Sequence, residues 1–476
     1  MKYLNLITLI LILTASMLFA QNETKLSLKE CIQITIENNS ELKNAERNVK
    51  IAKSGILMAY SNILPTLNTD LRIAKTYQGE VEYLQDVPVE YEREMMEIPI
   101  LDPISYDTVN IVLFPVTGKP TRYEQKLISQ DAYSRRSNSF SINLNQNIFD
   151  GGRWWNSIRK ARADKRGSEY FAETTRQQII LNTKLYYFNL LKQQALLKVF
   201  EEALHSTEEQ YNRTKSMYEI GSVAQADVYK ARVSVGEAKS NLIKQENLVN
   251  VSKYNLNYVM GRDPRTPIEV VDENIEFIPQ ENMELPIESA LENNPELQTL
   301  RTDITSAEFS HKIAKGNFWP VLRAGASYSR FSPEFDRVYK GYDKNYNWYA
   351  GVSLSYNIFN GFADKANKDI EKLRYLNAQE TFLERKRQIR ADVEEYRSNM
   401  KANLEIIEIN KENLVSAEED LRLARERYRV GSGTLLEVLE AQVSVIRAQS
   451  NLISAKYDAL ISQAQLEAAL GIVRKE

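Results

Sequence analysis

Histidine and cysteine are almost absent from this 476-residue chain, which contains 2 His and 1 Cys. Structural zinc sites, Fe–S clusters and disulfide frameworks need several such residues, so we predict no metal site and no cofactor. Glycine and proline are also scarce, at 17 and 13 residues, which argues against a mainly disordered chain. The net charge of −3 provides no basic field to attract nucleic acid, and we expect no nucleic-acid partner.

Long apolar runs are lacking beyond the first twenty residues, which excludes a polytopic helical membrane protein. Lys2 precedes an apolar stretch from Leu4 to Ala20, and this order is typical of a secretory signal peptide over 1–20. A membrane anchor is the alternative, although the run is short and lacks a positive stop signal. Cys31 is interpreted as a small apolar residue of the first helix rather than as a reactive thiol.

An internal repeat organises the rest of the chain. The segment 147–152 (Asn-Ile-Phe-Asp-Gly-Gly) returns 210 positions later as 357–362 (Asn-Ile-Phe-Asn-Gly-Phe). The segment Tyr218–Ser222 returns at the same offset as Tyr428–Ser432. Three landmarks at one offset, with Met260-Gly261 matching Leu470-Gly471 as the third, predict that both halves share one plan.

Each half carries a segment that is free of proline and spaced in heptads. No proline lies between Pro120 and Pro264, and none follows Pro333, so very long helices are permitted. Apolar residues recur every seven positions in both segments, at Leu190, Leu197, Leu204, Tyr211 and Tyr218, and at Met400, Ile407, Leu414, Leu421 and Tyr428. This spacing predicts coiled-coil helical hairpins, and a first arm such as 153–218 would be about 100 Å long.

Strands are predicted between the helical segments. Apolar and small polar residues alternate over 66–77, 140–145, 321–331 and 348–358, which fits a membrane β-barrel with a wet lumen. A β-sandwich would show a similar alternation. Aromatic residues cluster at the strand ends, as in interfacial belts, and favour the barrel. The predicted interface aromatics are Phe149, Trp154, Trp155, Trp319, Trp348 and Phe359.

Four strands are too few to close a barrel, which needs about eight or more. An open sheet edge in lipid would leave backbone groups unsatisfied at several kcal/mol each. The chain is therefore expected to assemble with copies of itself.

The doubled order of strand, long helix, glycine tip and returning helix resembles the TolC-type outer-membrane efflux proteins, also called outer membrane factors. The matching residues are the strand-end motifs at 147–152 and 357–362 and the tips at 221–228 and 431–438. The resemblance implies an α+β membrane protein in which three chains form a 12-stranded outer-membrane β-barrel, continued by a coiled-coil α-helical tube in the periplasm. It also implies a homotrimer in outer-membrane lipid, a periplasmic membrane-fusion (adaptor) protein and an inner-membrane pump of unstated class.

On this reading the mature chain divides into six parts. They are a periplasmic helix (21–65), a β-hairpin (66–150) with a long extracellular insert (about 78–138), a helical hairpin (151–264) with its tip at 218–228, a linker with the second periplasmic helix (265–320), a second β-hairpin (321–360) and a second helical hairpin (361–476) with its tip at 428–438. The insert is expected to be a long solvated loop, with a lid or a plug as alternatives. Residues 111–114 indicate a short extra hairpin within it.

The tips are the predicted functional site. The resemblance implies a periplasmic gate at Asp227, Tyr428, Glu437 and Glu440, with Asp227 and Tyr428 bonded to each other. It implies adaptor docking at Gly221, Ser222, Val223, Val228, Gly431, Ser432 and Val438. Glycine suits the left-handed residue that ends a helix, and this structural role holds whatever else the tips do. The family often has an arginine where this chain has Gly433, so one latch of the gate is missing.

The predicted function is that of the exit duct of a tripartite efflux or type I secretion system. A structural coiled-coil envelope protein without transport is the alternative, although it leaves the strands and aromatic belts unexplained. No enzyme is expected, because His205 and His311 have no nucleophile arrangement, phosphate loop or metal spacing near them.

Overall fold

The computed structural model describes residues 25–101, 103, 105, 108–272, 287–340 and 344–471. The predicted signal peptide at 1–20 and part of the predicted linker lie outside these residues. The chain divides into a helical unit, made of 1–62, 150–319 and 357–476, and a sheet unit, made of 63–149 and 320–356. Within the described ranges, none of the helices has an apolar stretch long enough to cross a bilayer.

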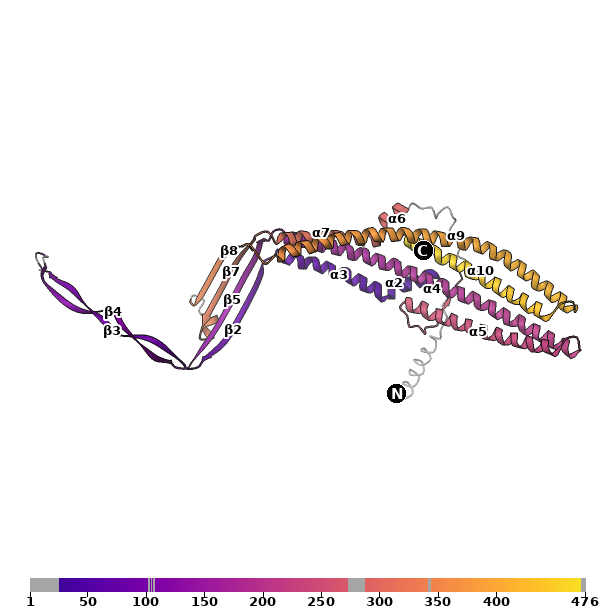
Figure 1. Ribbon diagram of the computed structural model, residues 1–476, viewed down its shortest axis with the longest axis horizontal. Coiled ribbons are helices and arrows are strands. Elements are labelled where there is room, and N and C mark those ends of the chain that lie inside the picture. The colour runs from indigo at the N-terminus through magenta and orange to yellow at the C-terminus, as the bar shows by residue number, and fades with distance from the viewer. Residues whose placement is uncertain are drawn as a thin grey trace, which may run out of the picture. The chain divides into compact units, whose positions relative to one another are not determined.

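Two helical hairpins make up most of the helical unit (Figure 1). One joins α4 (Arg153–Glu219) to α5 (Gln225–Val259), and the other joins α9 (Ala363–Arg429) to α10 (Leu435–Ala469). The long arms α4 and α9 have 67 residues each, and the return arms α5 and α10 have 35 each. The shorter elements are β1 (Lys25–Leu26), α2 (Leu28–Asn38), α3 (Ser40–Ser61), β6 (Glu269–Val270), α6 (Ile287–Asn293) and α7 (Pro295–Gly316).

The repeated strand-end motif starts both long helices. The Asp150 carboxylate accepts a hydrogen bond from the backbone N–H of Trp154 at 3.0 Å. At the matching place the Asn360 side chain accepts one from the N–H of Asp364 at 3.4 Å. Each bond satisfies one of the backbone donors that the first helical turn leaves without a partner. Gly152, with φ of +78°, turns the chain into α4.

The main core of the helical unit lies where α2, β1 and β6 meet the long helices. Tyr187 of α4 is fully buried there, and its hydroxyl donates to the carbonyl of Val271 at 2.5 Å. Cys31 of α2 is buried in the same cluster, as expected for a small apolar residue. Burial and the nearby Asp272 raise the pKa of Tyr457 to about 12, so this phenol stays neutral at physiological pH.

The heptad pattern holds in α9 and shifts in α4. Met400, Ile407 and Tyr428 are all buried at the predicted spacing. In the tip half of α4, by contrast, the predicted core residue Tyr218 is 41% exposed, so this expectation is wrong. The buried stripe there runs one position earlier and is made of Ala203, Thr207, Gln210 and Thr214. These side chains are small or satisfy their own polar atoms: the hydroxyls of both threonines donate to carbonyls one turn earlier.

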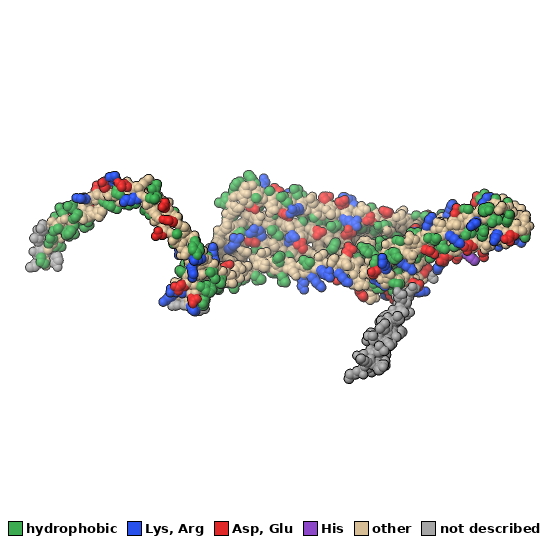
Figure 2. Space-filling model, turned by 90° about the horizontal axis from the view of Figure 1, so that it is seen from below, with side chains coloured by type: hydrophobic (Ala, Val, Ile, Leu, Met, Phe, Trp, Pro, Cys, Tyr) green, Lys and Arg blue, Asp and Glu red, His purple; other side chains and the backbone are tan. Residues whose placement is uncertain are grey.

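Charged side chains are scattered among apolar and other polar ones on the visible face of the helical unit (Figure 2). Acidic and basic groups are interspersed over the face seen in Figure 2, as a solvated outer face requires.

The sheet unit contains an antiparallel four-stranded sheet of order β2–β5–β7–β8. The strands are β2 (Thr66–Gln78), β5 (Tyr133–Phe149), β7 (Val321–Ser332) and β8 (Tyr346–Ser355), and α8 (Asp336–Tyr339) lies between β7 and β8. The register pairs Leu71 with Phe140 and Asp70 with Ser141, so one face is apolar and the other is polar. The predicted alternation of apolar and polar residues along the strands therefore gives the sheet one apolar and one polar face.

The insert is a paired β-hairpin rather than the expected solvated loop. β3 (Val81–Leu101) and β4 (Thr108–Gln130) form an antiparallel ladder with register shifts between Pro88 and Arg93 (Figure 1). The expected short hairpin at 111–114 is part of β4. Both strands of a two-stranded ribbon are edges, and edge strands are where proline is tolerated. Prolines such as Pro88 and Pro115 are therefore compatible with the ladder.

The ion pair between Lys184 of α4 and Glu467 of α10 provides a test of helix packing. Their side chains are 7% and 16% exposed and the charged atoms lie 3.0 Å apart. Replacing Glu467 by Gln leaves the ammonium buried without a counter-charge, and should destabilise the helical unit by about 3 kcal/mol or more. Thermal unfolding of the purified protein in detergent measures the change.

The matched control is Asp458→Asn on the same two helices. Its partner Lys192 also lies at 3.0 Å, but the carboxylate is 45% exposed, and the expected cost is below about 1 kcal/mol. Equal losses in the two variants would show that burial does not set the strength of these pairs.

Candidate functional site

The two tips share one turn geometry. Gly221 and Gly431 have φ of +82° and +77°, a left-handed conformation that ends each long helix. The next residue then bonds back into the helix: the N–H of Ser222 donates to the carbonyl of Met217 at 2.8 Å, and the N–H of Ser432 donates to that of Arg427 at 2.9 Å. This is the glycine helix ending that the sequence analysis predicted for both tips.

The second tip is held by more side-chain contacts than the first. Thr434 caps α10 by accepting a hydrogen bond from the N–H of Glu437 at 3.3 Å. The Glu437 carboxylate also lies 2.8 Å from the guanidinium of Arg427 on α9. In the first tip Ala224 takes the capping position and offers no side-chain acceptor. Glu437 therefore has a structural role that the sequence analysis did not assign to it.

Gly433 lies close to the last turn of α9. Its N–H donates to the carbonyl of Arg427 at 3.0 Å. A Cβ atom at this position would lie 3.0 Å from the Arg427 Cβ and 3.2 Å from the Tyr428 nitrogen, so a side chain would displace the turn. The tip has no arginine at this position, but Arg427, six residues earlier, supplies a guanidinium to the same turn.

Asp227 and Tyr428 do not bond to each other within one chain. The Asp227 carboxylate lies 3.6 Å from the ammonium of Lys230 on its own helix. Tyr428 is buried among Leu435, Val438 and other apolar residues, and its hydroxyl has no hydrogen-bond partner in the described part of the chain. The predicted contact is therefore not formed by the single chain.

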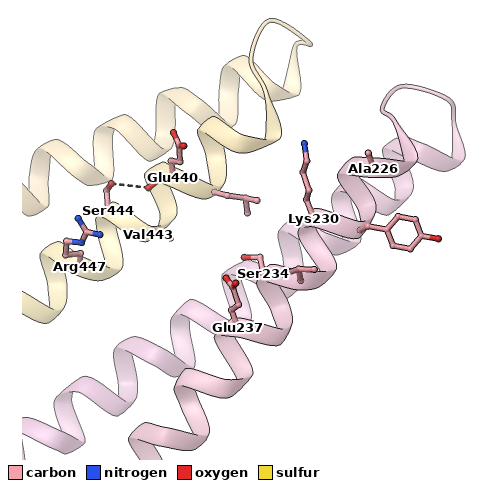
Figure 3. Close-up of a pocket in the computed structure, with 11 residues that line it drawn as sticks. Ala226, Lys230, Ser234, Glu237, Glu440, Val443, Ser444 and Arg447 are labelled. Carbon is pink, nitrogen blue, oxygen red and sulfur yellow. Dashed lines mark hydrogen bonds between the residues drawn. The ribbon is translucent and has the colours of Figure 1, made fainter.

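An open groove separates α5 from α10 behind the tips, with a volume of about 820 Å³ (Figure 3). Its floor is apolar: Val233 and Val443 are 62% and 54% exposed. Lys230 from α5 and Glu440 from α10 line it with charges of opposite sign. The full lining is Ala226, Tyr229, Lys230, Val233, Ser234, Glu237, Leu439, Glu440, Val443, Ser444 and Arg447.

The sequence analysis named only Glu440 of this tip groove, although a signal for the rest is present. Val233-Ser234-Val235 returns as Val443-Ser444-Val445 at the repeat offset of 210. Two valines that are two positions apart point about 200° apart on a helix. Val235 and Val445 take the heptad positions, so Val233 and Val443 are left exposed in the groove.

The remaining predicted tip residues lie at or near the turns. Gly221, Ser222, Gly431 and Ser432 are exposed, Val223 and Val228 are half-buried, and Val438 is fully buried. Most predicted interface aromatics are exposed, including Phe149, Trp155, Trp319, Trp348 and Phe359, whereas Trp154 is half-buried and lies against the ring of Trp155 at 4.3 Å.

A family model described as outer membrane efflux protein matches residues 105–262 and 287–472. The chain belongs to the outer membrane efflux protein family. The resemblance predicted from the strand-end and tip motifs is thereby confirmed, and the protein is assigned to the outer membrane.

Curated relatives of this efflux protein match about three quarters of its length. It is 25% identical over 382 residues to the outer membrane protein TolC of Escherichia coli, covering 76% of each chain. It is also 25% identical over 377 residues to the toluene efflux pump outer membrane protein TtgC of Pseudomonas putida, covering 75% of each.

Solved structures share the fold. The CmeC outer membrane channel of Campylobacter jejuni superposes with a TM-score of 0.75 at 18% identity, covering 93% of this chain and 85% of that one. The open MtrE outer membrane channel of Neisseria gonorrhoeae gives 0.71 at 19% identity, covering 94% and 90%. The efflux protein therefore has the fold of the TolC-like outer-membrane channels.

A polar contact that the heptads did not predict joins the two hairpins near the tip groove. The Ser206 hydroxyl of α4 accepts hydrogen bonds from Arg425 of α9 and from Gln442 of α10, both at 2.6 Å. Burial and the neighbouring Arg213 lower the pKa of the Arg425 guanidinium, so this contact holds a partly desolvated cation. Ser206 thus fixes α4 relative to both helices of the second hairpin.

Replacing Ser206 by Ala should destabilise the tip region by about 1–3 kcal/mol, because it leaves two buried donors without their acceptor. Limited proteolysis at the tips and thermal unfolding measure the effect. Ser222→Ala, on the exposed turn, is the control and should change neither. A silent Ser206→Ala variant would mean that the contact does not hold the hairpins together.

Proposed function

We propose that this efflux protein is the exit duct of a tripartite efflux or type I secretion system. In this proposal three chains form a 12-stranded barrel in the outer membrane, and their helical units form a periplasmic tube. A periplasmic adaptor docks at the tips, and an inner-membrane pump loads the cargo. The tip groove, with an apolar floor and both a basic and an acidic residue on each side, is the observation that carries the docking step.

The sheet unit supports assembly from several copies. β2 and β8 are the outer strands of the four-stranded sheet, and each has one unpaired edge. Lipid cannot satisfy those backbone groups, whereas pairing β2 of one copy with β8 of the next would do so. The polar face of the sheet, with residues such as Asp70 and Ser141, would then line the lumen and the apolar face would meet lipid.

The tip groove supports docking of a helical partner. Val233, Val443 and Tyr229 expose a strip of apolar surface between two parallel-running helices, and such grooves accept the apolar face of an amphipathic helix. Lys230 and Glu440 would fix the partner's register through charge, which contributes specificity more than affinity. A purely structural envelope protein would have no need for this exposed strip.

Charge introduced into the groove tests adaptor docking. The double variant Val233→Glu/Val443→Glu should abolish in-cell photocrosslinking of the adaptor from the tips, because two carboxylates would be desolvated on docking. The control is Val415→Glu on α9, where the parent side chain is 68% exposed and outside the groove lining. Unchanged crosslinking in the double variant would place docking elsewhere.

We further propose that the gate acids act at the tip end of the tube. Asp227 lies in the first turn of α5, Tyr428 carries a buried hydroxyl, and Glu437 and Glu440 share one face of α10. The Tyr428 hydroxyl is buried within the single chain, so in a trimer an Asp227 carboxylate would bond to it only after the tip rearranges.

Replacing Asp227 by Ala should raise the single-channel conductance of the reconstituted pore, because the closed state would lose a contact of about 1 kcal/mol or more. Lys230→Ala is the matched control, since it breaks the same local ion pair but keeps the carboxylate. An equal rise in both variants would assign the effect to the helix start, and no rise in Asp227→Ala would remove it from the gate.

A further inference from the structure

Two cations face each other on the sheet without an anion between them. Lys75 of β2 lies directly opposite Arg136 of β5 in the antiparallel ladder. Both side chains are exposed, and neither forms an ion pair with any residue that the structure describes. Like charges in directly opposed positions destabilise a strand pair. The Lys75 ammonium lies 4.4 Å from the centre of the Tyr77 ring, but this neutral ring supplies no counter-charge, so an anion from outside would relieve the repulsion.

The Lys75–Arg136 pair lies at the end of the apolar face of the sheet. Leu67, Leu71 and Ile73 precede Lys75 on the same face of β2, because side chains on one face recur every second residue. At about 3.3 Å per residue, the distance along the strand from Leu67 to Lys75 is about 26 Å. That is close to the apolar height of a membrane β-strand, about 25 Å. The cations therefore lie at the edge of the band that would contact acyl chains.

The connection between β7 and β8 folds onto this same apolar face. Phe335, Val338 and Tyr339 line a cavity of about 320 Å³ together with Leu71 and Phe140 of the sheet. The buried guanidinium of Arg330 holds the connection by donating to the carbonyls of Arg337 and Lys340, at 3.0 and 2.9 Å. Of these aromatic side chains, Phe335 also lines the hollow that contains the cations.

A hollow of about 770 Å³ lies between the cation pair and this connection. Its lining includes the acids Glu334 and Asp336 beside Lys75 and Arg136. The acids are already paired, Glu334 with Arg337 at 2.8 Å and Asp336 with Lys340 at 3.2 Å. The charge that stays uncompensated in the hollow is therefore positive.

We propose that Lys75 and Arg136 bind the phosphate of an anionic outer-leaflet lipid, with its acyl chains along the apolar stripe below. The inference rests on the proposed barrel, which makes the apolar face the lipid face. β2 follows α3 in the chain and Lys75 lies near the far end of β2, so in the proposed barrel, with the helical unit in the periplasm, Lys75 would lie at the outer leaflet. Arg and Lys are the side chains that bind phosphate, and basic clusters beside an apolar surface select anionic lipid.

A lipid phosphate explains the site better than free phosphate does. The cation pair is continuous with the apolar stripe of Leu71 and Ile73, which a soluble anion would not use. A ligand that carries both phosphate and acyl chains matches both parts of the surface.

The test uses the full-length protein in detergent, titrated with diphosphoryl lipid A and followed by native mass spectrometry. The variant Lys75→Ser/Arg136→Ser should bind the lipid about tenfold more weakly or worse, since it loses two charge-assisted contacts. The matched control is Arg72→Ser/Arg135→Ser, which removes two cations from the opposite face of the same strands. Its affinity should stay within about twofold of the parent's.

Three outcomes would overturn the inference: equal losses in the two variants, no loss in either, or complete competition by inorganic phosphate at equal concentration. The proposed function is judged separately on the same samples, from heat-modifiable trimer bands and channel conductance. A protein that forms pores but fails the lipid test refutes only the lipid site, whereas a parent protein without pores refutes the duct.

Discussion

The unpaired edges of β2 and β8 are the constraint on which the sheet unit depends. A bilayer offers no hydrogen bonds, so each exposed backbone group in the hydrocarbon costs several kcal/mol. Four strands with one apolar and one polar face have the side chains that a barrel wall needs. The backbone groups on the outer edges of β2 and β8, however, have no hydrogen-bond partners in the sheet. Copies of the chain are the economical source of the missing partners, and the internal repeat supplies two hairpins per copy. Assembly is thus a condition for the sheet to exist in lipid.

The helical unit is packed differently near α2 and in the tip half of α4. Near α2 the core is built from large apolar side chains such as Tyr187 and Leu190, whereas the tip half of α4 buries Ala203, Thr207 and Thr214. Small and self-satisfied side chains contribute less hydrophobic stabilisation, about 25 cal/mol per Å² of apolar area buried. The tip half of α4 is therefore the part of the first hairpin that can rearrange at low cost, whereas Tyr428, Leu435 and Val438 belong to a buried apolar cluster at the second tip. A segment that has to close, open or receive a partner is expected at the low-stability end of a fold.

The spacing of apolar residues predicted the helices and strands. It did not predict contacts between elements that are far apart in the chain. Proline placement and heptads were enough to locate α4 and α9, because helix length depends on local spacing. The register between the helices could not be located in this way, as the one-residue shift from Leu204 to Ala203 shows: both positions are apolar, and only packing against other helices decides which of them is buried. The Ser206 contact joins residues more than 200 positions apart, so no local pattern reports it. The β3–β4 hairpin was missed because the insert was expected to be a solvated loop, with only residues 111–114 assigned to a short hairpin.

The missing arginine at Gly433 illustrates how a role can move along the chain without being lost. A Cβ atom at this position would lie 3.0–3.2 Å from atoms of Arg427 and Tyr428, so a side chain here would require the turn to shift slightly. Arg427 reaches Glu437 from the preceding helix, and the turn keeps both its glycine and its guanidinium. The Glu437 carboxylate is thus engaged by Arg427, and Glu440 is the acid of α10 that lines the groove. Of the two carboxylates that spacing alone makes equivalent, only Glu440 is then available to an incoming partner or cation.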